Sequence, residues 1–165
     1  MNFKSPIGNL IASADDTYLY FIMFEDSFKL LSTLQLLSNE LDCEYVLDEN
    51  EILIRFKKEL EAYFNGDLTN FSIPIKTFGS DYQKEVWKAL QNLPYAKTET
   101  YGGVARNMGR SIDHARAVGT ACGANSHLLI VPCHRVTASN SKGGFSCGID
   151  RKEWLLQHEN NNCMK

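Results

Sequence analysis

The chain has 165 residues, of which 44% are hydrophobic and 22% charged, a composition that allows a buried core and excludes a disordered or fibrous protein. It contains no apolar run long enough to cross a bilayer, and its first residues, "MNFKSPIGNL", lack the pattern of a signal peptide, so we expect a cytoplasmic protein. Residues 1–75 hold 5 lysines and arginines against 13 acidic residues, whereas residues 76–165 hold 12 against 7, which indicates that only the second half meets an anionic partner.

Residues 1–75 are predicted to form a small α/β domain. The segment "LIASADDTYLYFIMF" has the pattern of two apolar strands joined by a turn at Asp15–Asp16. The segment "SFKLLSTLQLL" has helical periodicity behind Ser27 as a candidate cap, and "EILIRFKKELEAYFNG" predicts a second helix that ends at Gly66. The stretch "FSIPI" is typical of a short edge strand or a linker, because Pro74 cannot donate a hydrogen bond within a sheet. This half carries no recognisable catalytic motif, which favours a structural role.

Residues 76–165 have a mainly helical pattern, so the predicted fold class is α+β. The segment "SDYQKEVWKALQNLP" begins with Ser80 and Gln83 at the spacing of a capping box. "TETYGGVARNMG" predicts a short helix closed by Gly109, and "SIDHARAVGTACGAN" predicts a further helix with Ser111 as its cap. Two short helices across a glycine-containing turn in a basic region favour a helix-turn-helix, although a helical hairpin that binds nothing has the same pattern.

Small residues surround one arginine on the last of these helices. Ala115, Ala117 and Gly119 are small, and Arg116 stands among them. Small side chains let a helix approach another surface closely, which fits tight packing inside the protein. The same pattern fits a helix that enters a DNA groove and uses Arg116 as its one long side chain.

The segment "LLIVPCHRV", residues 128–136, places three reactive side chains after an apolar run. The run predicts a buried strand that leads into Cys133, His134 and Arg135. A cysteine attacks as the thiolate, so a nearby imidazole can serve as its base. Contact between neighbouring residues requires a bend in the strand, and Pro132 makes such an irregularity plausible. The alternative is a buried structural cysteine beside a histidine at the end of a strand.

The five cysteines are scattered and include no C-x-x-C pair, so we expect free thiols rather than disulfides or a zinc ribbon. A metal site made of Cys133, His134, Cys147 and a fourth ligand stays open, although its spacing is irregular. We expect no metal and no cofactor.

The motif "PCHRV", with "RAVG" upstream and "KEWLLQHE" downstream, resembles the methylated-DNA–protein-cysteine methyltransferases, the O6-alkylguanine-DNA alkyltransferase family. The resemblance runs from Phe78 to Glu159 and includes "VWKALQNLPYAKTETYG", whereas the N-terminal half matches only in size and general character. It implies a ribonuclease H-like N-terminal domain, residues 1–75, and a C-terminal helix-turn-helix domain, residues 76–165. It also implies a monomer that binds double-stranded DNA carrying O6-alkylguanine through the minor groove and flips the damaged base into a pocket.

The resemblance further implies repair in a single turnover, by irreversible transfer of the alkyl group from O6-methylguanine, and from O4-methylthymine, to Cys133. His134 would be the base, acting through a water molecule, and Glu159 would orient its imidazole. Asn125 would brace the turn near the cysteine. Tyr101 would lie near the 3′ phosphate and help to protonate the leaving base.

The resemblance also assigns residues that contact DNA and residues that line the pocket, and Arg116 would take the place of the flipped base in the stack. The implied DNA-binding residues are Arg116, Tyr101, Ala115, Ala117 and Gly119, and the implied pocket residues are Val136, Phe145, Ser146 and Cys147.

One loop departs from the family pattern. The stretch "GGFSCGI" stands where the family usually has "GYxGG", so Phe145 keeps an aromatic wall without a hydroxyl, and Cys147 replaces a glycine. The added bulk predicts weaker acceptance of large alkyl groups such as benzyl, while Ser146 still offers a backbone N–H toward O6 of the guanine. The stretch "GRSIDHARAVG" is one residue longer than usual, so the turn before the second short helix is expected to differ.

Other functions fit parts of the pattern. A non-catalytic binder of alkylated DNA is the main alternative, and Cys133 argues against it because relatives of that kind lack the cysteine. A cysteine hydrolase using Cys133, His134 and Glu159 would need an oxyanion hole and turnover, and the sequence has no feature that indicates a peptide or ester substrate. A helix-turn-helix regulator would usually dimerise, and the sequence predicts no dimerisation helix.

Overall fold

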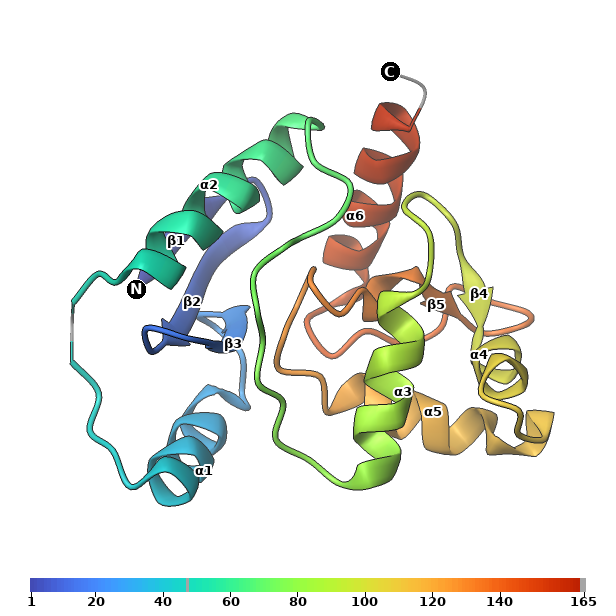
Figure 1. Ribbon diagram of the computed structural model, residues 1–165. Helices are drawn as coiled ribbons and strands as arrows, with labels where there is room; N and C mark the ends of the chain where they lie inside the picture. Colours follow the sequence, from blue (N-terminus) through green and yellow to red (C-terminus); the bar gives the residue numbers. More distant parts are fainter. Residues whose placement is uncertain (47, 164–165) are drawn as a thin grey trace. The chain divides into compact units, whose positions relative to one another are not determined.

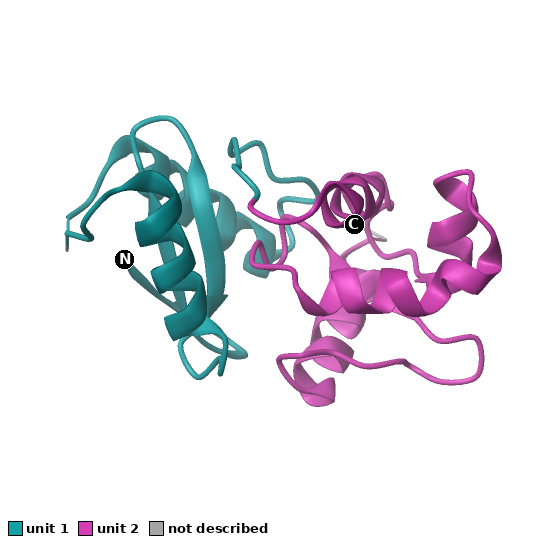
Figure 2. Ribbon diagram, turned by 90° about the horizontal axis from the view of Figure 1, so that it is seen from below, with its two compact units in different colours: residues 1–77 teal, residues 78–165 magenta. Residues whose placement is uncertain are grey.

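The computed structural model describes residues 1–46 and 48–163. They form two compact units, Met1–Thr77 and Phe78–Lys165, coloured teal and magenta in Figure 2. The first unit is built on a small antiparallel sheet with helices, and the second is mainly helical. The predicted α+β class is therefore confirmed. Within the described residues, no helix is both long and apolar enough to span a membrane.

The sheet of the first unit has the strand order β1-β2-β3 (Figure 1). The elements of this unit are β1 Asn2–Ser5, β2 Gly8–Ala14, β3 Leu19–Phe24, α1 Leu30–Leu41 and α2 Glu51–Asn65. The antiparallel hairpin of β2 and β3 agrees with the prediction, and in its turn the Asp15 carboxylate accepts hydrogen bonds from the N–H groups of Thr17 and Tyr18, each at 2.7 Å. The sequence pattern does not predict β1, because four residues are too few to show an alternation.

Helices α1 and α2 differ in how their ends are capped. α1 follows Lys29, which makes no capping side-chain hydrogen bond, so the prediction that Ser27 caps this helix is wrong. The side chain of Asn50 caps α2 by accepting a hydrogen bond from the Leu53 N–H at 2.9 Å. α2 ends at Gly66, whose φ of 80° lies in the left-handed region that favours glycine, as predicted.

Aromatic side chains fill the core of the first unit. Phe56 of α2 packs edge-on against Phe3 of β1 with ring centroids 5.4 Å apart, and Tyr63 lies 5.4 Å from Phe71. All residues of β3 are buried. Every residue predicted for the functional site lies in the second unit.

The second unit packs three short helices against one another, and its longest helix, near the C-terminus, contacts the turn that contains Cys133. Its elements are α3 Asp81–Gln91, β4 Glu99–Thr100, α4 Tyr101–Asn107, the 3₁₀ turn η1 Ile112–His114, α5 Ala115–Gly123, the 3₁₀ turn η2 Cys133–Arg135, β5 Val136–Thr137 and α6 Ile149–Asn162. The predicted capping box of Ser80 and Gln83 starts α3. The indole N–H of Trp87 donates to the Ala121 carbonyl at 2.8 Å, which ties α3 to α5 inside the core.

The helix α5 begins later than predicted, because the turn η1 precedes it. Gly109, with φ of 72°, follows α4 as expected. Ser111 caps the turn η1, where its hydroxyl accepts a hydrogen bond from the Asp113 N–H at 3.3 Å, and it does not cap α5 itself. The α-helix starts at Ala115, so Arg116 lies in its first turn.

The apolar run before the reactive cysteine is a buried turn, and the predicted strand is wrong. Residues 128–131 are buried, but Leu129 has a φ of 71° and the Val131 N–H donates to the His127 carbonyl at 2.9 Å. A left-handed residue and a proline without an N–H, Pro132, do not fit a strand. The 3₁₀ turn η2 follows directly, so Cys133, His134 and Arg135 do not alternate between two faces as they would in a strand.

Candidate active site

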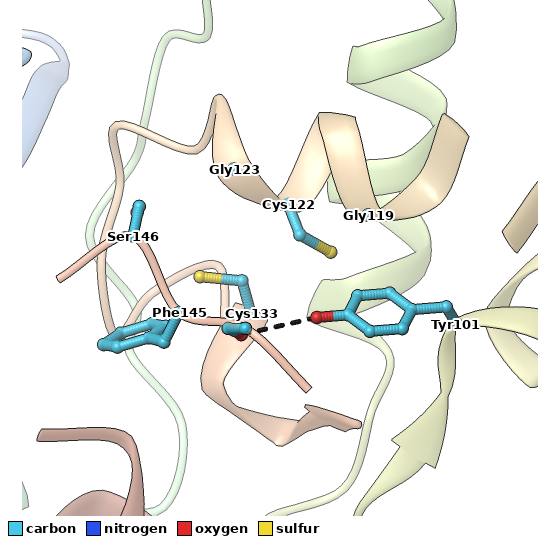
Figure 3. Close-up of a pocket in the computed structure, with 8 residues that line it drawn as sticks. Tyr101, Gly119, Cys122, Gly123, Cys133, Phe145 and Ser146 are labelled. Carbon is cyan, nitrogen blue, oxygen red and sulfur yellow. Dashed lines mark hydrogen bonds between the residues drawn. The ribbon is translucent and has the colours of Figure 1, made fainter. Parts of the chain in front are cut away.

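A cavity of about 180 Å³ opens in the second unit between α4, α5, η2 and the loop before α6 (Figure 3). Its lining residues are Tyr101, Gly119, Cys122, Gly123, Cys133, Gly144, Phe145 and Ser146. Figure 3 shows Gly119, Cys122 and Gly123 along α5, with Tyr101, Cys133 and Phe145 below this helix in the view. The predicted pocket residues Phe145 and Ser146 form part of the wall, whereas Val136 and Cys147 are not among the lining residues of the described chain.

The thiol of Cys133 forms part of the cavity wall and is otherwise enclosed. Its residue is 5% exposed, and the Asn125 amide donates hydrogen bonds to Sγ at 3.2 Å and to the Val131 carbonyl at 2.8 Å. The Asn125 side-chain oxygen accepts the His127 N–H at 2.8 Å. One buried amide therefore links the turn before the cysteine to the sulfur itself.

Burial raises the pKa of the Cys133 thiol to about 11. The Asn125 hydrogen bond and the positive charge of Lys152 act in the opposite direction, and the neighbouring Cys147 thiol adds to the rise. At neutral pH the sulfur is therefore protonated. Since the nucleophile is the thiolate, this site needs a base.

A buried carboxylate holds the imidazole of His134, the residue that follows Cys133 in the chain. Glu159 of α6 is fully enclosed, and its Oε1 lies 2.8 Å from Nε2 of His134. Arg135 donates to the same carboxylate from Nε, 2.9 Å from Oε2, and the Ala96 N–H donates to Oε2 at 2.9 Å. Burial alone would raise the pKa of Glu159, but the hydrogen bonds and charges of His134 and Arg135 outweigh it and lower the pKa to about 2. The carboxylate is thus ionised at neutral pH.

The ionised carboxylate determines which nitrogen of His134 can accept a proton. Burial lowers the pKa of His134, so its imidazole is neutral at pH 7. In a neutral ring one nitrogen donates and the other accepts. Because Nε2 faces the acceptor-only carboxylate, Nε2 carries the hydrogen and Nδ1 is the basic nitrogen.

Tyr101 forms the wall opposite the cysteine turn. Its hydroxyl donates to the Gly144 carbonyl at 3.3 Å, the interaction dashed in Figure 3. Burial raises the pKa of this phenol, which keeps its proton available for donation. Gly143, with φ of 70°, lies so close that a Cβ atom there would sit 3.0 Å from the hydroxyl, which explains the glycine in this loop.

The helix α5 presents its small residues beside the cavity. Arg116 and Ala117 are exposed and Ala115 is half-buried, while Gly119 lies at the boundary because it also lines the cavity. The residues Val118 and Ala121 face the core, and both are almost fully buried. The exposed arginine and the cavity therefore belong to the same short helix.

Sequence reasoning missed part of the wall. Cys122 follows Gly119 by three residues, so helical periodicity could have placed its thiol on the same face. Gly144 could not be found this way, because the fold alone brings its partner close: Nζ of the buried Lys152, which does not line the cavity, donates to the Gly144 carbonyl at 3.2 Å and to the Val136 carbonyl at 2.5 Å. Among the described residues, no group of three or more His, Cys, Asp or Glu side chains is arranged to hold a metal ion.

Comparisons with known proteins match both units. The family model described as "6-O-methylguanine DNA methyltransferase, ribonuclease-like domain" matches residues 2–77, and the model described as "6-O-methylguanine DNA methyltransferase, DNA binding domain" matches residues 81–161. The methylated-DNA–protein-cysteine methyltransferase of Methanosarcina acetivorans is 39% identical over 159 residues, 95% of each chain.

Solved structures agree with the sequence matches. The crystal structure of Mycobacterium tuberculosis O6-methylguanine methyltransferase superposes with a TM-score of 0.83 at 33% identity, covering 98% of this chain and 92% of that one. Mycobacterium tuberculosis OGT in complex with DNA gives a TM-score of 0.80 at 32% identity, with the same coverage.

Proposed function

The chain belongs to the 6-O-methylguanine DNA methyltransferase family, and from this premise we propose that it repairs DNA by direct reversal, moving the alkyl group of O6-methylguanine irreversibly to its own Cys133. The observation that carries the proposal is the enclosed Cys133 thiol in a cavity wall, followed directly by an imidazole that a buried carboxylate orients. We extend the substrate range to O4-methylthymine in duplex DNA.

The reaction balances without a cofactor. The thiolate of Cys133 attacks the alkyl carbon, so an S–C bond forms and the C–O6 bond breaks, with the electron pair leaving on the guanine. The thiol loses one proton and the guanine gains one. Because a thioether is a poor leaving group, the alkyl group stays on the sulfur and each chain reacts once.

The base in this reaction is His134. Its Nδ1 takes the proton of Cys133 through a bridging water molecule, and the Nε2–H hydrogen bond to Glu159 stabilises the imidazolium that results. The Asn125 amide, which already donates to Sγ, stabilises the thiolate as it forms. Before a substrate enters, burial keeps the thiol protonated and therefore weakly reactive toward other electrophiles.

Donors around the cavity stabilise the leaving guanine. The Tyr101 hydroxyl is held at the wall and can release its hydrogen bond to Gly144 in favour of the base. Ser146, also in the wall, offers its backbone N–H toward O6. Hydrogen-bond donors placed where negative charge develops lower the barrier to such a step.

The DNA side of the site is formed by the helix pair. We propose that α4, η1 and α5 act as a helix-turn-helix that binds duplex DNA through the minor groove, with Arg116 filling the space of the flipped base. Base flipping costs a few kcal/mol of stacking, and an inserted side chain offsets part of it. The basic balance of residues 76–165 supports contact with phosphates.

Substrate size and cellular setting complete the proposal. Cys147 stands where the family usually has glycine and is half-buried next to the wall residue Ser146, so we propose a preference for small alkyl groups over benzyl. The relay is complete within one chain, which supports action as a monomer. The free Cys133 thiol requires a reducing compartment, which supports a cytoplasmic location.

A stoichiometric repair assay tests this function. A fixed amount of duplex containing one O6-methylguanine is titrated with the protein, and the remaining modified base is counted after digestion. We expect one lesion removed per chain and none with Cys133→Ser. Repeated turnover would contradict suicide transfer. Retained lesion binding without any repair would identify a non-catalytic binder of alkylated DNA.

A further inference from the structure

Arg135 and His134 share one carboxylate. Arg135 is 4% exposed, and its guanidinium donates to Glu159 from Nε and from NH2, the latter 3.0 Å from Oε1. The same Oε1 lies 2.8 Å from Nε2 of the imidazole. The remaining end of the guanidinium donates to the Leu93 carbonyl at 2.8 Å, so the arginine is fixed at both ends.

We propose that Arg135 is a positioning residue for the reaction: by neutralising the carboxylate it shares with His134, it keeps the imidazole free of a proton and ready to take the one that Cys133 releases. The inference rests on the proposed function, because it concerns the base of that reaction. It assigns to Arg135 an electrostatic effect on the base, beyond the hydrogen bonds that hold the turn in place.

The net charge of the buried cluster decides whether His134 takes up a proton. A carboxylate enclosed with only an imidazole is a single buried charge, and such a pair takes up a proton to become neutral overall. With the guanidinium present, Glu159 and Arg135 already compensate each other. A proton on His134 would then add an uncompensated positive charge to the interior, so the neutral ring is favoured.

The groups around the imidazole agree with this view. The charged groups that act on the imidazole are Glu159 and Lys152 of α6 and Arg135 of its own turn. The ring of Tyr95 lies against the guanidinium of Arg135, with its centroid 5.5 Å away. Burial is the main cause that lowers the pKa of His134, and the positive charges of Arg135 and Lys152 lower it further. Only Glu159 raises it, and Arg135 compensates that carboxylate directly.

The consequence is a defined pH dependence. An imidazole that is already protonated cannot accept the proton of the thiol, so alkyl transfer falls off at low pH. This fall in rate is the acidic limb of the pH–rate profile, and without the guanidinium charge it moves to higher pH. For each unit by which the limb moves, the rate at a pH on the limb falls about tenfold, and it recovers at higher pH.

The test compares Arg135→Gln with Arg135→Lys in single-turnover repair across pH. The glutamine removes the charge but keeps N–H donors for Glu159, whereas the lysine keeps the charge but loses the planar fork. We expect the acidic limb to move up by at least one unit in R135Q and to stay in place in R135K. A rate lowered by the same factor at every pH in both variants would show a purely structural role and overturn the proposal.

A second measurement is independent of alkyl transfer. Nuclear magnetic resonance of the imidazole nitrogens follows the protonation of His134 with pH in full-length Cys133→Ser protein, with and without R135Q. We expect a neutral ring carrying its hydrogen on Nε2 at pH 7 in the arginine form, and a midpoint at higher pH in the glutamine form. An imidazolium at pH 7 with Arg135 in place would overturn the proposal even if R135Q failed to fold. If the unaltered protein transferred no alkyl group, the proposed function would fail while this titration still decided the effect of Arg135.

Discussion

At the scale of single residues, the site is held by buried polar side chains that use nearly all their hydrogen-bonding capacity. Asn125 is 4% exposed, donates to the Val131 carbonyl and to the Cys133 sulfur, and accepts the His127 N–H. A buried donor or acceptor that loses its partner costs about 1–3 kcal/mol. Asn125 therefore couples the stability of the second unit to the environment of the thiol.

Replacing Asn125 by leucine, a side chain of similar size, is expected to destabilise the protein by about 1–3 kcal/mol, because the buried His127 N–H loses its acceptor and the Val131 carbonyl keeps only the Cys133 N–H. The thiol also loses a donor to its charged form, so the reaction of Cys133 with a thiol reagent is expected to need higher pH. Urea unfolding and the pH dependence of alkylation measure the two effects. Asn160→Leu, at an exposed position of α6, is the control and should change stability by less than about 0.5 kcal/mol. Equal stability of the two variants would refute the role given to Asn125.

Much of the residue-scale site is predictable from the sequence because it lies in contiguous motifs. "PCHRV" contains the thiol and the imidazole, and "KEWLLQHE" contains Glu159. The contacts of Arg135 and Lys152 are not predictable, since a motif records which residues are present and not which atoms they meet. Arg135 reaches a carboxylate 24 positions away and a carbonyl 42 positions away. The burial of His127, which is 1% exposed, is not predictable either, because no motif in the sequence includes it.

At the scale of secondary-structure elements, α5 joins the outer surface to the cavity. It is a nine-residue helix whose Arg116 is exposed in the first turn and whose Gly119 and Gly123 line the cavity. A Cβ at Gly123 would meet no other atom within 4 Å, so only the open space of the cavity lies beside it. The helix thus presents two glycines and the Cys122 side chain to the cavity, and it carries its long side chain on the exposed face.

Replacing Arg116 by alanine is expected to slow repair of duplex DNA about tenfold, since about 1.4 kcal/mol of support for the flipped state would be lost. The reaction with free O6-methylguanine base needs no flipping and should keep its rate. Single-turnover kinetics on both substrates check this. Arg55→Ala on α2 removes the same charge from the first unit and serves as the control. If both substrates slowed equally, Arg116 would act on the cavity rather than on the DNA.

Element prediction succeeds where periodicity is long and fails where the backbone is locally unusual. The amphipathic patterns of α2 and α3 predict both helices together with their end signals, Gly66 and Ser80. The run "LLIV" predicts burial correctly but not backbone shape, because four apolar residues fit a buried turn as well as a strand. The left-handed Leu129 could not be expected from its residue type, since leucine rarely adopts that conformation.

At the scale of the whole molecule, acid is expected to act on the second unit through its buried relay. The pKa of Glu159 is lowered to about 2 in the folded chain from an ordinary value of 4.5, so its stabilisation is complete above pH 4.5 and is lost as the pH falls toward 2. Burial lowers the pKa of His134 below its ordinary value of 6.5, so the unfolded chain also gains a proton there as the pH falls below 6.5. Both groups therefore make the folded state less stable in acid.

The free energy of unfolding of the second unit is expected to fall by about 3 kcal/mol between pH 5 and pH 2 through Glu159 alone. Both tryptophans, Trp87 and Trp154, lie in this unit, so their fluorescence during urea unfolding reports on it. Glu159→Gln should be less stable at pH 7 and should lose this acid dependence. Glu153→Gln, at an exposed site on the same helix, should keep it. Parallel pH profiles for both variants would exclude the buried carboxylate as the cause.

The most direct test of the central claim is the intact mass of the protein after incubation with a duplex that contains one O6-methylguanine, followed by peptide mapping. The account predicts a gain of one methylene group per chain, located on Cys133, and no gain in Cys133→Ser. An unchanged mass with the lesion still bound, or a methyl group located on another residue such as Cys122 or Cys147, would contradict it.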